Sequence, residues 1–418
     1  MLLAADLHLH SRYSTGVSPA MTLENIAVWA LRKGLDVLGT GDCLQPNWLR
    51  EIEASTAPSE GENGFLRLTN EVQERVWSRV PIGLRRPLRF VLSTEVDCLP
   101  PTKTKFQGLH HLLYFPTFDS AHAFAEELRA HGDLSEGRPT VNLTPLQLLE
   151  RTLEHGPRCH FAPAHVFNPW FSDLGTVGGE TSLEELYVDL TAELLGVETG
   201  LTSIPPMCRR VSSLDRHALF SCSDAHSLEN LGREYTVVDC APNYDALFAA
   251  LADVTARQVV QTIKLALYET PYYLNWCSNC KAPFDAVICP TPGCRRALVT
   301  GARDRLEKIA DRAVMPAAIK PVHQELRPLP LLIARTLRTS KKTASAQRVA
   351  AAIVDRLGHE RYVLTEATEA EIAGAGLASF ARPIVEQRGA GTDYFRTTLG
   401  AAANDAASQT ILNLDLPD

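Results

Sequence analysis

The sequence predicts an α/β barrel, followed by a zinc ribbon and a small helical region. Over residues 1–268, short apolar runs typical of buried strands alternate about seven times with amphipathic stretches typical of helices. This alternation favours a parallel barrel whose site lies on the loops after the strands. Four cysteines cluster within residues 269–315, residues 316–400 are predicted to form a helical domain, and residues 401–418 a disordered tail.

The barrel elements are predicted from their period and their flanking residues. The expected strands are Ala4–Leu9, Val37–Gly39, Phe90–Ser93, Leu112–Phe115, His160–Ala164, Leu195–Glu198 and Leu219–Ser221. The expected helices are Leu23–Lys33, Ser120–His131, Pro145–His155, Ser182–Leu194 and Tyr244–Leu251, with an insertion at Ala54–Pro87 that has its own helix around Asn70–Arg79. Further on, four prolines between Pro316 and Pro330 predict a linker, and helices are expected at Leu331–Arg338, Ala346–Leu357 and Glu369–Arg388.

Composition and charge narrow the classes of function. The 418 residues are 45% hydrophobic and 22% charged, without an apolar run of membrane-spanning length. The five residues before Asp6 leave no room for a signal peptide, and six of the ten cysteines are scattered, so we expect a cytoplasmic protein. Residues 270–350 hold fourteen Lys and Arg against five Asp and Glu, whereas residues 1–269 hold 22 against 34. This asymmetry favours catalysis in the acidic part and polyanion binding in the basic part, although a solvated basic face would look the same.

Two short strings carry metal-ligand residues at alternate positions. His8 and His10 lie at the end of the first predicted strand, and Asp224 and His226 follow the last one. Residues i and i+2 of a strand point to the same side, so each pair aims at one spot. Other candidates also lie at or beside the ends of predicted strands: Asp42, Glu95, His110 or His111, His165 and Glu198.

This set of imidazoles and carboxylates favours Zn²⁺, Mn²⁺ or Fe²⁺ over Ca²⁺. Eight or nine ligand-type residues are too many for one ion, so we expect two or three. Clustered metals suit phosphoester hydrolysis, because one ion activates water while its neighbours stabilise the charge on the phosphoryl and leaving oxygens.

The strings around these residues resemble the successive motifs of the polymerase-and-histidinol-phosphatase (PHP) superfamily. They are Ala5–His10, Gly39–Asp42, Ser93–Glu95, His111–Leu113, Ala164–His165, Val197–Glu198 and Ser223–His226. The resemblance implies a distorted seven-stranded α/β barrel with a trinuclear metal site. His8, His10, Glu95 and Asp224 would surround one ion, with Asp224, Glu95 and His165 central to catalysis. Glu95 would bridge to a second ion held by His111 and His165, and Asp42 and His226 would hold a third.

The chain departs from the superfamily pattern in three places. Asp42 stands where a histidine is usual, and Thr15 stands where an aspartate or histidine is frequent. His110 and His111 compete for one ligand position, and His111 is favoured because Leu112–Phe115 follows it directly, as in relatives. Glu198 matches its motif, but we expect it to support a ligand rather than bind metal.

Longer strings resemble the endonuclease Q family of DNA-repair nucleases: Leu38–Trp48, Pro163–Phe171, Glu198–Thr202 and Ser223–Glu234. The resemblance implies a metal-dependent endonuclease that cuts the strand 5′ of deaminated bases (deoxyuridine, deoxyinosine, deoxyxanthosine) and abasic sites, and leaves a 3′-hydroxyl and a 5′-phosphate. It covers the barrel and extends more weakly through the cysteines and basic helices. Residues Gly389–Gly400 lack the ending that the family resemblance leads us to expect.

Reading a lesion requires taking the base out of the stack and holding it between flat side chains. The aromatic residues after Asp42 and His165 suit that task, although Trp170 and Phe171 would equally suit packing at the barrel rim. Among the arginines, Arg233 is the best candidate for a phosphate contact because it lies in a family string. The candidates for DNA or lesion binding are therefore Trp48, Phe167, Trp170, Phe171 and Arg233.

The four clustered cysteines, Cys277, Cys280, Cys289 and Cys294, have the spacing of a compact four-cysteine zinc ribbon. A closed set of four thiolates leaves no open position on the metal, so this zinc would be structural. Arg295, Arg296, Arg303 and Arg305 follow it, which favours DNA binding.

We expect two or three divalent metals (Zn, Mn or Mg) in the barrel and one structural Zn in the ribbon. The expected partner is lesion-containing DNA, double- or single-stranded, together with replication or repair factors, at the nucleoid and without a membrane. Two alternatives remain: a small-molecule phosphatase of the histidinol-phosphate type, and a non-catalytic DNA-binding adaptor whose barrel holds no metal.

Overall fold

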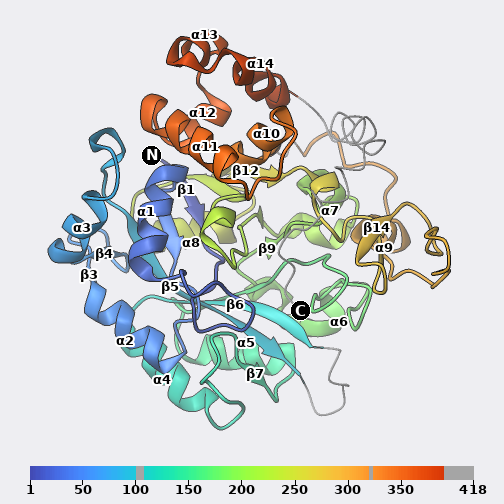
Figure 1. Cartoon of the computed structure of the whole chain (residues 1–418). Helices are drawn as coiled ribbons and strands as arrows, with labels where there is room; N and C mark the ends of the chain where they lie inside the picture. The colour runs from blue at the N-terminus through green and yellow to red at the C-terminus, as the bar shows by residue number, and fades with distance from the viewer. Residues whose placement is uncertain (100–107, 320–322, 390–418) are drawn as a thin grey trace.

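The computed structural model describes residues 1–99, 108–319 and 323–389. Its central feature is a mixed sheet in which the strand order is β15-β12-β11-β1-β2-β5-β4-β3, with β6 pairing with β5 and β8, and β7 with β5 (Figure 1). The strands are β1 (Leu2–Asp6), β2 (Val37–Gly39), β3 (Thr56–Pro58), β4 (Leu66–Leu68), β5 (Arg89–Cys98), β6 (Leu109–Phe115), β7 (Thr140–Val141), β8 (His160–Pro163), β11 (Tyr235–Asp239), β12 (Val259–Leu265) and β15 (His323–Leu326).

The pairing corrects the expectation of an all-parallel sheet. Strands β1, β2 and β5 are parallel neighbours, but β5, β6 and β8 are antiparallel, and so are β1, β11 and β12. The physical reason is that the ten residues 99–108 between β5 and β6 are fewer than a parallel crossover requires, which favours antiparallel pairing. Sequence analysis also missed β11, β12 and β15.

Two short strands, β9 (Val197–Glu198) and β10 (Leu219–Phe220), form a separate parallel pair beside the main sheet. Backbone hydrogen bonds join this pair to strands on both sides: Leu195 N–H donates to Phe161 O, and Asp224 N–H donates to His8 O. One apolar cluster collects side chains from β1, β5, β6, β8, β10 and β11, with Leu3, Leu112 and Phe220 among them. The strands therefore surround a shared interior.

The barrel helices begin and end at residues whose side chains or backbone suit those positions. Helix α1 (Leu23–Lys33) starts after Thr22, whose hydroxyl accepts from Asn25 N–H, and ends at Gly34 with φ 89°. This helix is confirmed at its predicted bounds. The other helices of this part are α2 (Pro46–Ser55), α3 (Asn70–Trp77), α4 (Phe118–Leu128), α5 (Pro145–Glu154), α6 (Glu184–Tyr187), α7 (Pro205–Cys208) and α8 (Tyr244–Ala252).

The helix predicted over Ser182–Leu194 is wrong. Only α6 is α-helical there, and a 3-10 segment, Val188–Glu193, follows it. Val188 ends α6 because its φ of 50° lies in the left-handed region, which a β-branched residue adopts only under strain.

The C-terminal helices form a cap at the top of Figure 1, in orange and red. They are α10 (Leu329–Thr336), α11 (Ala344–Leu357), α12 (Glu360–Thr365), α13 (Glu369–Ile372) and α14 (Ala378–Glu386). The cap is tied to α1 by two ion pairs, Lys33–Glu360 at 2.8 Å and Arg32–Asp355 at 2.7 Å. The stretch expected as a linker contains β15, which pairs in parallel with β12. The predicted tail, residues 401–418, lies outside the described residues.

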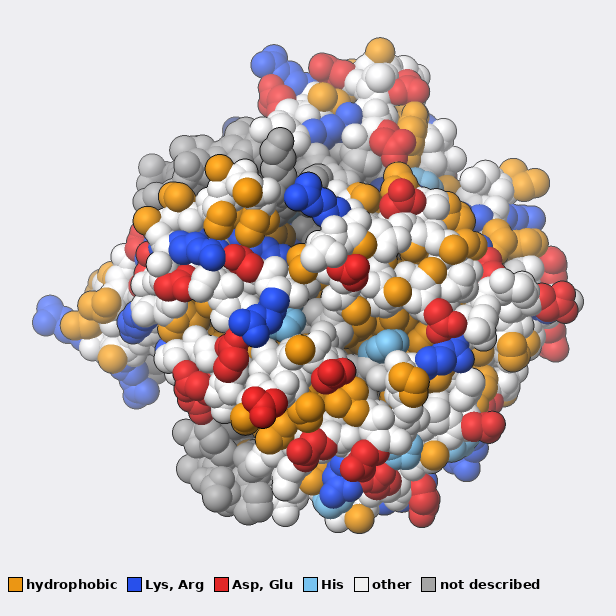
Figure 2. Space-filling model, turned by 180° about the vertical axis from the view of Figure 1, so that it is seen from behind, with side chains coloured by type: hydrophobic (Ala, Val, Ile, Leu, Met, Phe, Trp, Pro, Cys, Tyr) orange, Lys and Arg blue, Asp and Glu red, His pale blue; other side chains and the backbone are white. Residues whose placement is uncertain are grey.

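At the right of Figure 1, the hairpin of β13 (Asn275–Cys277) and β14 (Ala282–Phe284) precedes α9 (Ala302–Ile309). It is attached to the barrel by Thr176, whose hydroxyl donates to Thr300 O, and by Arg305, which donates to Leu174 O and Glu180 O. On the face seen in Figure 2, acidic and basic side chains are interspersed. None of the helices over the described ranges has the length and apolarity needed to cross a bilayer.

Candidate metal centre

The two strings from opposite ends of the barrel sequence meet at one edge of the sheet. Asp224 N–H donates to His8 O, and His10 N–H donates to Ala225 O, so the chain after β10 runs beside the chain after β1. As a result, Asp224 Oδ1 lies 3.5 Å from His8 Nε2 and 3.2 Å from His10 Nε2. The structure thus brings together side chains that are more than 200 residues apart in the sequence.

Glu95, on β5, lies at the middle of this cluster. Its Oε1 is 3.0 Å from His110 Nδ1 and 3.0 Å from His165 Nε2, while its Oε2 is 3.3 Å from His10 Nε2. The ligand atoms form three overlapping groups. The first contains His8, His10 and Glu95, the second His10, Asp224 and His226, and the third Glu95, His110 and His165. A carboxylate shared by two groups is the arrangement that a bridging metal ligand requires.

The preference for His111 over His110 is wrong. Strand β6 pairs antiparallel with β5 so that His110 stands opposite Asp97, and His111 opposite Val96. Asp97 shares a face with Glu95, because the two lie two residues apart on one strand, and His110 therefore faces the centre. His111 points to the other side, where its Nε2 lies 3.2 Å from Asp173 Oδ1.

Asp42 and Glu198 lie behind the histidines. Asp42 Oδ1 is 3.2 Å from His10 Nδ1, and its Oδ2 accepts hydrogen bonds from Ser11 N–H and Ser11 Oγ–H. Glu198 Oε1 lies 3.1 Å from His8 Nδ1, and its Oε2 accepts from His165 N–H. Each carboxylate orients an imidazole so that the far nitrogen, Nε2, faces the centre. Glu198 has the supporting position expected for it, whereas Asp42 does not hold a ligand atom within any of the three groups.

Backbone strain is concentrated at these residues. Asp42, His165 and Asp224 have φ values of 48°, 32° and 46°, in the left-handed region that non-glycine residues rarely adopt. Gly200, at φ 61°, packs so closely that an added Cβ would lie 2.4 Å from His165 Cβ. Strain of this kind is retained at functional sites because it aims side chains that unstrained backbone would turn away.

Burial and the nearby carboxylates have opposite effects on the pKa values of the histidines. Burial disfavours the imidazolium of His10, but hydrogen bonds to Asp224, Asp42 and Glu95 outweigh it and raise its pKa to about 10. The same competition, with Glu198 and Glu95, raises the pKa of His8 well above its ordinary value. At His110 and His226 burial prevails, and their pKa values fall to about 3 and about 4.

The centre has the donor chemistry of a divalent-metal site. The Nε2 atoms of His8 and His226 are buried and have no hydrogen-bond partner among the residues that the structure describes. Around them stand the carboxylates of Glu95 and Asp224. Burial acts to raise the pKa of each carboxylate, but His110 beside Glu95 and His226 beside Asp224 help to lower both pKa values below their ordinary range. Lone pairs of nitrogen and oxygen that face one another need a cation between them, and imidazole with carboxylate suits Zn²⁺, Mn²⁺ or Fe²⁺. The residues present therefore fit the metals that the sequence predicts.

Two of the expected lesion-binding aromatics lie in the core. Trp48 and Phe167 are fully buried, and the Trp48 indole N–H donates to Gly41 O at 2.8 Å. Their placement in a DNA interface is therefore wrong, because side chains after a strand can pack inward as well as line a site. Phe171 instead stacks on His110, with ring centroids 4.8 Å apart, and Trp170 contacts Tyr272 edge-on at 4.9 Å. Both are half-buried at the rim of the centre.

Arg233 is also committed within the protein. Its guanidinium donates to Ser223 O at 2.8 Å and to Asp224 O at 3.1 Å, so it shapes the loop that carries Asp224. Burial lowers the pKa of Arg233. These two hydrogen bonds give Arg233 a role in holding this loop, and its contact with DNA stays a prediction.

Sequence analysis missed Arg138. This residue lies in the loop before β7, and its Nη1 is 3.4 Å from Glu95 Oε2. No motif surrounds it, so its only signal in the sequence is a cation in the connection between the predicted helices Ser120–His131 and Pro145–His155.

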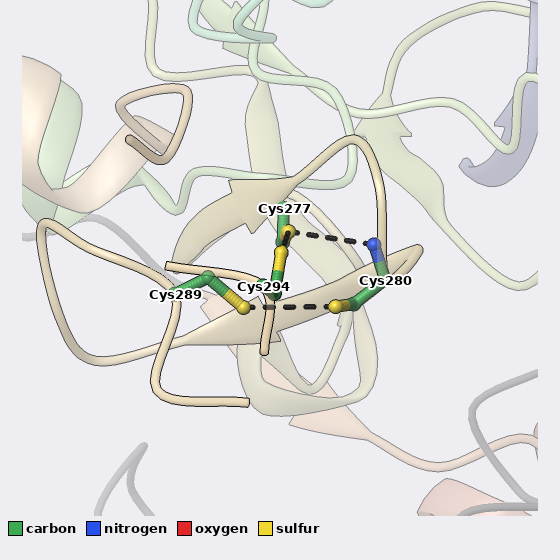
Figure 3. Close-up of side chains that lie close together, drawn as sticks. All are labelled: Cys277, Cys280, Cys289 and Cys294. Carbon is green, nitrogen blue, oxygen red and sulfur yellow. Dashed lines mark hydrogen bonds between the residues drawn. The ribbon is translucent and has the colours of Figure 1, made fainter. Parts of the chain in front are cut away.

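The four cysteines converge at the β13–β14 hairpin (Figure 3). Cys277 Sγ lies 3.7 Å from Cys294 Sγ, and Cys280 Sγ lies 3.6 Å from Cys289 Sγ. A tetrahedral ion with Zn–S bonds of about 2.3 Å requires S···S distances of about 3.8 Å, which is close to both separations. Cys280 N–H donates to Cys277 Sγ at 3.4 Å, as expected for the turn between two such ligands. The cluster fits a four-coordinate metal.

No family model matches the chain. It is 27% identical over 405 residues, 92% of this chain and 94% of the relative, to the uncharacterized protein YqxK of Bacillus subtilis strain 168.

Two solved structures match most of the chain at 28% sequence identity. One is the lesion-specific endonuclease PfuEndoQ from Pyrococcus furiosus, with a TM-score of 0.77 over 93% of this chain and 91% of that one. The other is endonuclease Q in complex with a 27-mer duplex substrate that has an abasic lesion at the active site, with a TM-score of 0.78 over 92% of this chain and 91% of that one. Together with the sequence strings and the gathered ligand groups, these matches at 28% identity support endonuclease Q family identity for the chain.

Proposed function

We propose that this protein is a metal-dependent DNA-repair endonuclease. It hydrolyses the phosphodiester 5′ of deoxyuridine, deoxyinosine, deoxyxanthosine or an abasic site, and leaves a 3′-hydroxyl and a 5′-phosphate. The observation that carries the proposal is the convergence of three ligand groups on Glu95 and Asp224, in a chain that matches endonuclease Q structures over more than nine-tenths of its length.

The proposed ligands are His8, His10, Glu95, His110, His165, Asp224 and His226. When bound there, two or three divalent metals would activate water and neutralise charge on the phosphate. Asp42 and Glu198 keep the Nε2 atoms of His10 and His8 turned toward the centre. Because Glu95 and Asp224 have lowered pKa values, they stay ionised at neutral pH and hold cations.

Phe171 and Trp170 are the proposed contacts for the displaced nucleotide. Phe171 already covers one ring of the centre, His110, with an interplanar angle of 13°. A flat, half-buried side chain at the rim can stack on a base whose phosphate lies at the centre. Trp48 and Phe167 have no part in this proposal.

The cysteine cluster is proposed to hold one structural Zn²⁺ and to complete a zinc ribbon that grips DNA. Support comes from the tetrahedral sulfur separations and from Arg295 and Arg296, which are exposed directly after Cys294. An edge-to-face series of rings, Trp170, Tyr272 and Trp276, connects the rim of the centre to the hairpin. DNA held at the centre would thus lie close to the ribbon.

The predicted barrel fold, cellular location and protein partners are consistent with this activity. The strands around the shared interior support the distorted seven-stranded barrel of the PHP superfamily. A DNA substrate places the enzyme with the chromosome, so the expected cytoplasmic, nucleoid-associated location and the contacts with replication or repair factors stay predictions.

The test is a cleavage assay on matched duplexes, each with one deoxyuridine, deoxyinosine, deoxyxanthosine, abasic site or no lesion. With Mn²⁺ or Mg²⁺ we expect a single nick, on the 5′ side of the lesion, and no cutting of the undamaged duplex. Activity on phosphomonoesters with intact duplexes throughout would replace the proposal with the small-molecule phosphatase. DNA binding without cutting, and one zinc per chain, would favour the adaptor.

A further inference from the structure

Arg138 reaches the metal centre with most of its hydrogen-bonding capacity unused. Its side chain is 28% exposed, and over the described residues its one hydrogen bond runs from Nη1 to Glu95 Oε2 at 3.4 Å. A bidentate arginine–carboxylate pair would have two contacts of about 2.7–2.9 Å. The guanidinium carries five N–H donors, so most of them remain for a ligand at the mouth of the centre.

The loop around Arg138 is fixed in position by contacts on both sides. Gly137 N–H donates to Tyr13 O at 3.0 Å, and Pro139 O accepts from Asp97 N–H at 3.0 Å. Gly137 approaches Asp42 so closely that an added Cβ would lie 2.5 Å from Asp42 Oδ2. Glu136 accepts a hydrogen bond from the Thr15 hydroxyl at 3.0 Å. The loop therefore holds its arginine against the centre without needing the Glu95 contact.

Other arginines near the barrel edge are used differently. Arg209 donates to Leu214 O and His217 O, and Arg233 donates to Ser223 O and Asp224 O, so both stabilise loops. Arg12 pairs with Glu51 at 2.5 Å. Arg210 pairs with Glu307 at 2.8 Å. Arg138 differs from all four because its weak single contact is with a candidate metal ligand.

Charge gives the reason for a cation at this place. The centre contains four carboxylates, those of Asp42, Glu95, Glu198 and Asp224, and two or three divalent ions would balance or exceed that charge. Glu95 would then be occupied by metal, and the guanidinium would be left facing the mouth. An arginine in such a position matches the planar pair of oxygens on a phosphate.

We propose that Arg138 binds a non-bridging oxygen of the scissile phosphate and stabilises the charge that develops there during hydrolysis. This inference rests on the proposed endonuclease function. The competing explanation is that Arg138 only neutralises Glu95 and so supports metal binding.

The experiment compares Arg138→Ala and Arg138→Lys with Arg129→Ala, which removes an exposed arginine that pairs with Glu126 at the end of α4. Single-turnover cleavage of an abasic-site duplex should fall about 10²–10³-fold in Arg138→Ala, and less in Arg138→Lys. Added guanidinium ion should restore part of the rate of Arg138→Ala alone. Metal content should stay at the wild-type value in all three variants, and Arg129→Ala should cleave normally.

A binding measurement separates phosphate contact from support of Glu95. In an Asp224→Asn background, which suppresses turnover, affinity is measured for two duplexes that differ only in having a phosphodiester or a neutral methylphosphonate at the cleavage position. The protein with Arg138 should prefer the phosphodiester, and Arg138→Ala should lose at least about tenfold of that preference. An unchanged preference, or loss of metal in proportion to loss of activity, would overturn the assignment. If wild-type protein cuts no lesion duplex, the proposed function itself has failed.

Discussion

The histidine–carboxylate centre and the cysteine cluster both gather metal-ligand side chains, but they are built in opposite ways. The centre takes its residues from β5, β6 and the segments after β1, β8 and β10, which span residues 8–226. The cluster takes its four thiols from residues 277–294, around one short hairpin. The barrel must fold before the centre exists, whereas the cluster can be assembled by its ion.

The centre and the cysteine cluster also differ in the types of ligand atom that they contain and in backbone strain. The centre has unpartnered nitrogens and three residues at positive φ next to the ligand groups, and its mouth admits solvent at Asp224, whose side chain is 23% exposed. The cluster has four like donors that close a tetrahedron. Open, mixed sites suit catalysis and closed thiolate sites suit structure. Removing a ligand residue should therefore reduce activity at the histidine–carboxylate centre and disrupt local folding at the cysteine cluster.

The largest expected effect is at the cysteine cluster. Cys277→Ser should release one zinc per chain and unfold the hairpin, since structural zinc contributes about 10–16 kcal/mol of apparent binding free energy. Metal analysis and limited proteolysis should show loss of one ion and cutting within residues 275–299, while the barrel keeps its other ions. Loss of the barrel ions as well would mean that the two sites are not independent.

Neighbouring histidines on β6 offer a matched pair. His110→Ala should lower cleavage on the order of 10²-fold or more through loss of metal, with little change in stability. His111→Ala should instead lower the free energy of unfolding by about 2–4 kcal/mol, because it leaves a cavity and removes one of the hydrogen-bond partners of buried Asp173, and should leave metal content unchanged. Metal titration and thermal melting of both variants check this, and the reverse pattern would restore His111 as the ligand.

The supporting carboxylates should matter less than the ligands. Glu198→Gln keeps the shape of the side chain but weakens its hold on His8 Nδ1, so metal affinity should fall about 10–100-fold. Isothermal titration with Mn²⁺ measures it. Full loss of binding would make Glu198 a ligand, and no change would remove it from the centre.

Those features of the fold and of the two sites that depend on neighbouring residues could be predicted from the sequence. The four cysteines are close together in the sequence, so their spacing predicts the cluster directly. Thr22 and Gly34 lie next to the two ends of α1, so they predict where this helix begins and ends. The pairs His8/His10 and Asp224/His226 were identified because strand alternation is a local rule. Strand pairing is not local, and so the antiparallel β6, the added β15 and the register that selects His110 could not be foreseen from periodicity alone.

Burial of individual side chains was likewise out of reach. Trp48 and Phe167 follow strand ends just as Trp170 and Phe171 do, yet the first two pack inward and the second two remain at the rim. Arg138 had no motif, and its position depends on the contact of Gly137 with Asp42, nearly a hundred residues earlier. Three-dimensional packing decides all of these.

The smallest expected effect concerns a histidine outside both sites. His160 stacks on Phe248 at 4.5 Å, and burial lowers its pKa to about 4, whereas the carboxylates of the centre raise that of His10 to about 10. Because the unfolded chain protonates His160 near pH 6.5, stability is complete above that pH and is lost as pH falls toward 4. His160→Phe should reduce the stability lost between pH 7 and pH 5 by about 1–2 kcal/mol.

Denaturant unfolding of wild type and His160→Phe at both pH values measures this difference. An equal loss of stability in the two proteins would show that His160 is protonated as readily in the folded state as in the unfolded one.

The central claim is that the histidine–carboxylate centre holds the metals that hydrolyse DNA. It is tested most directly by stripping the barrel ions from wild type and Asp224→Ala, and then titrating Mn²⁺ into each with an abasic-site duplex. Cleavage of that duplex by wild type should return with Mn²⁺, while Asp224→Ala binds the duplex equally well but cuts it at least about 10³-fold more slowly. Equal cleavage by the two proteins, or cleavage by wild type without any added metal, would contradict the claim.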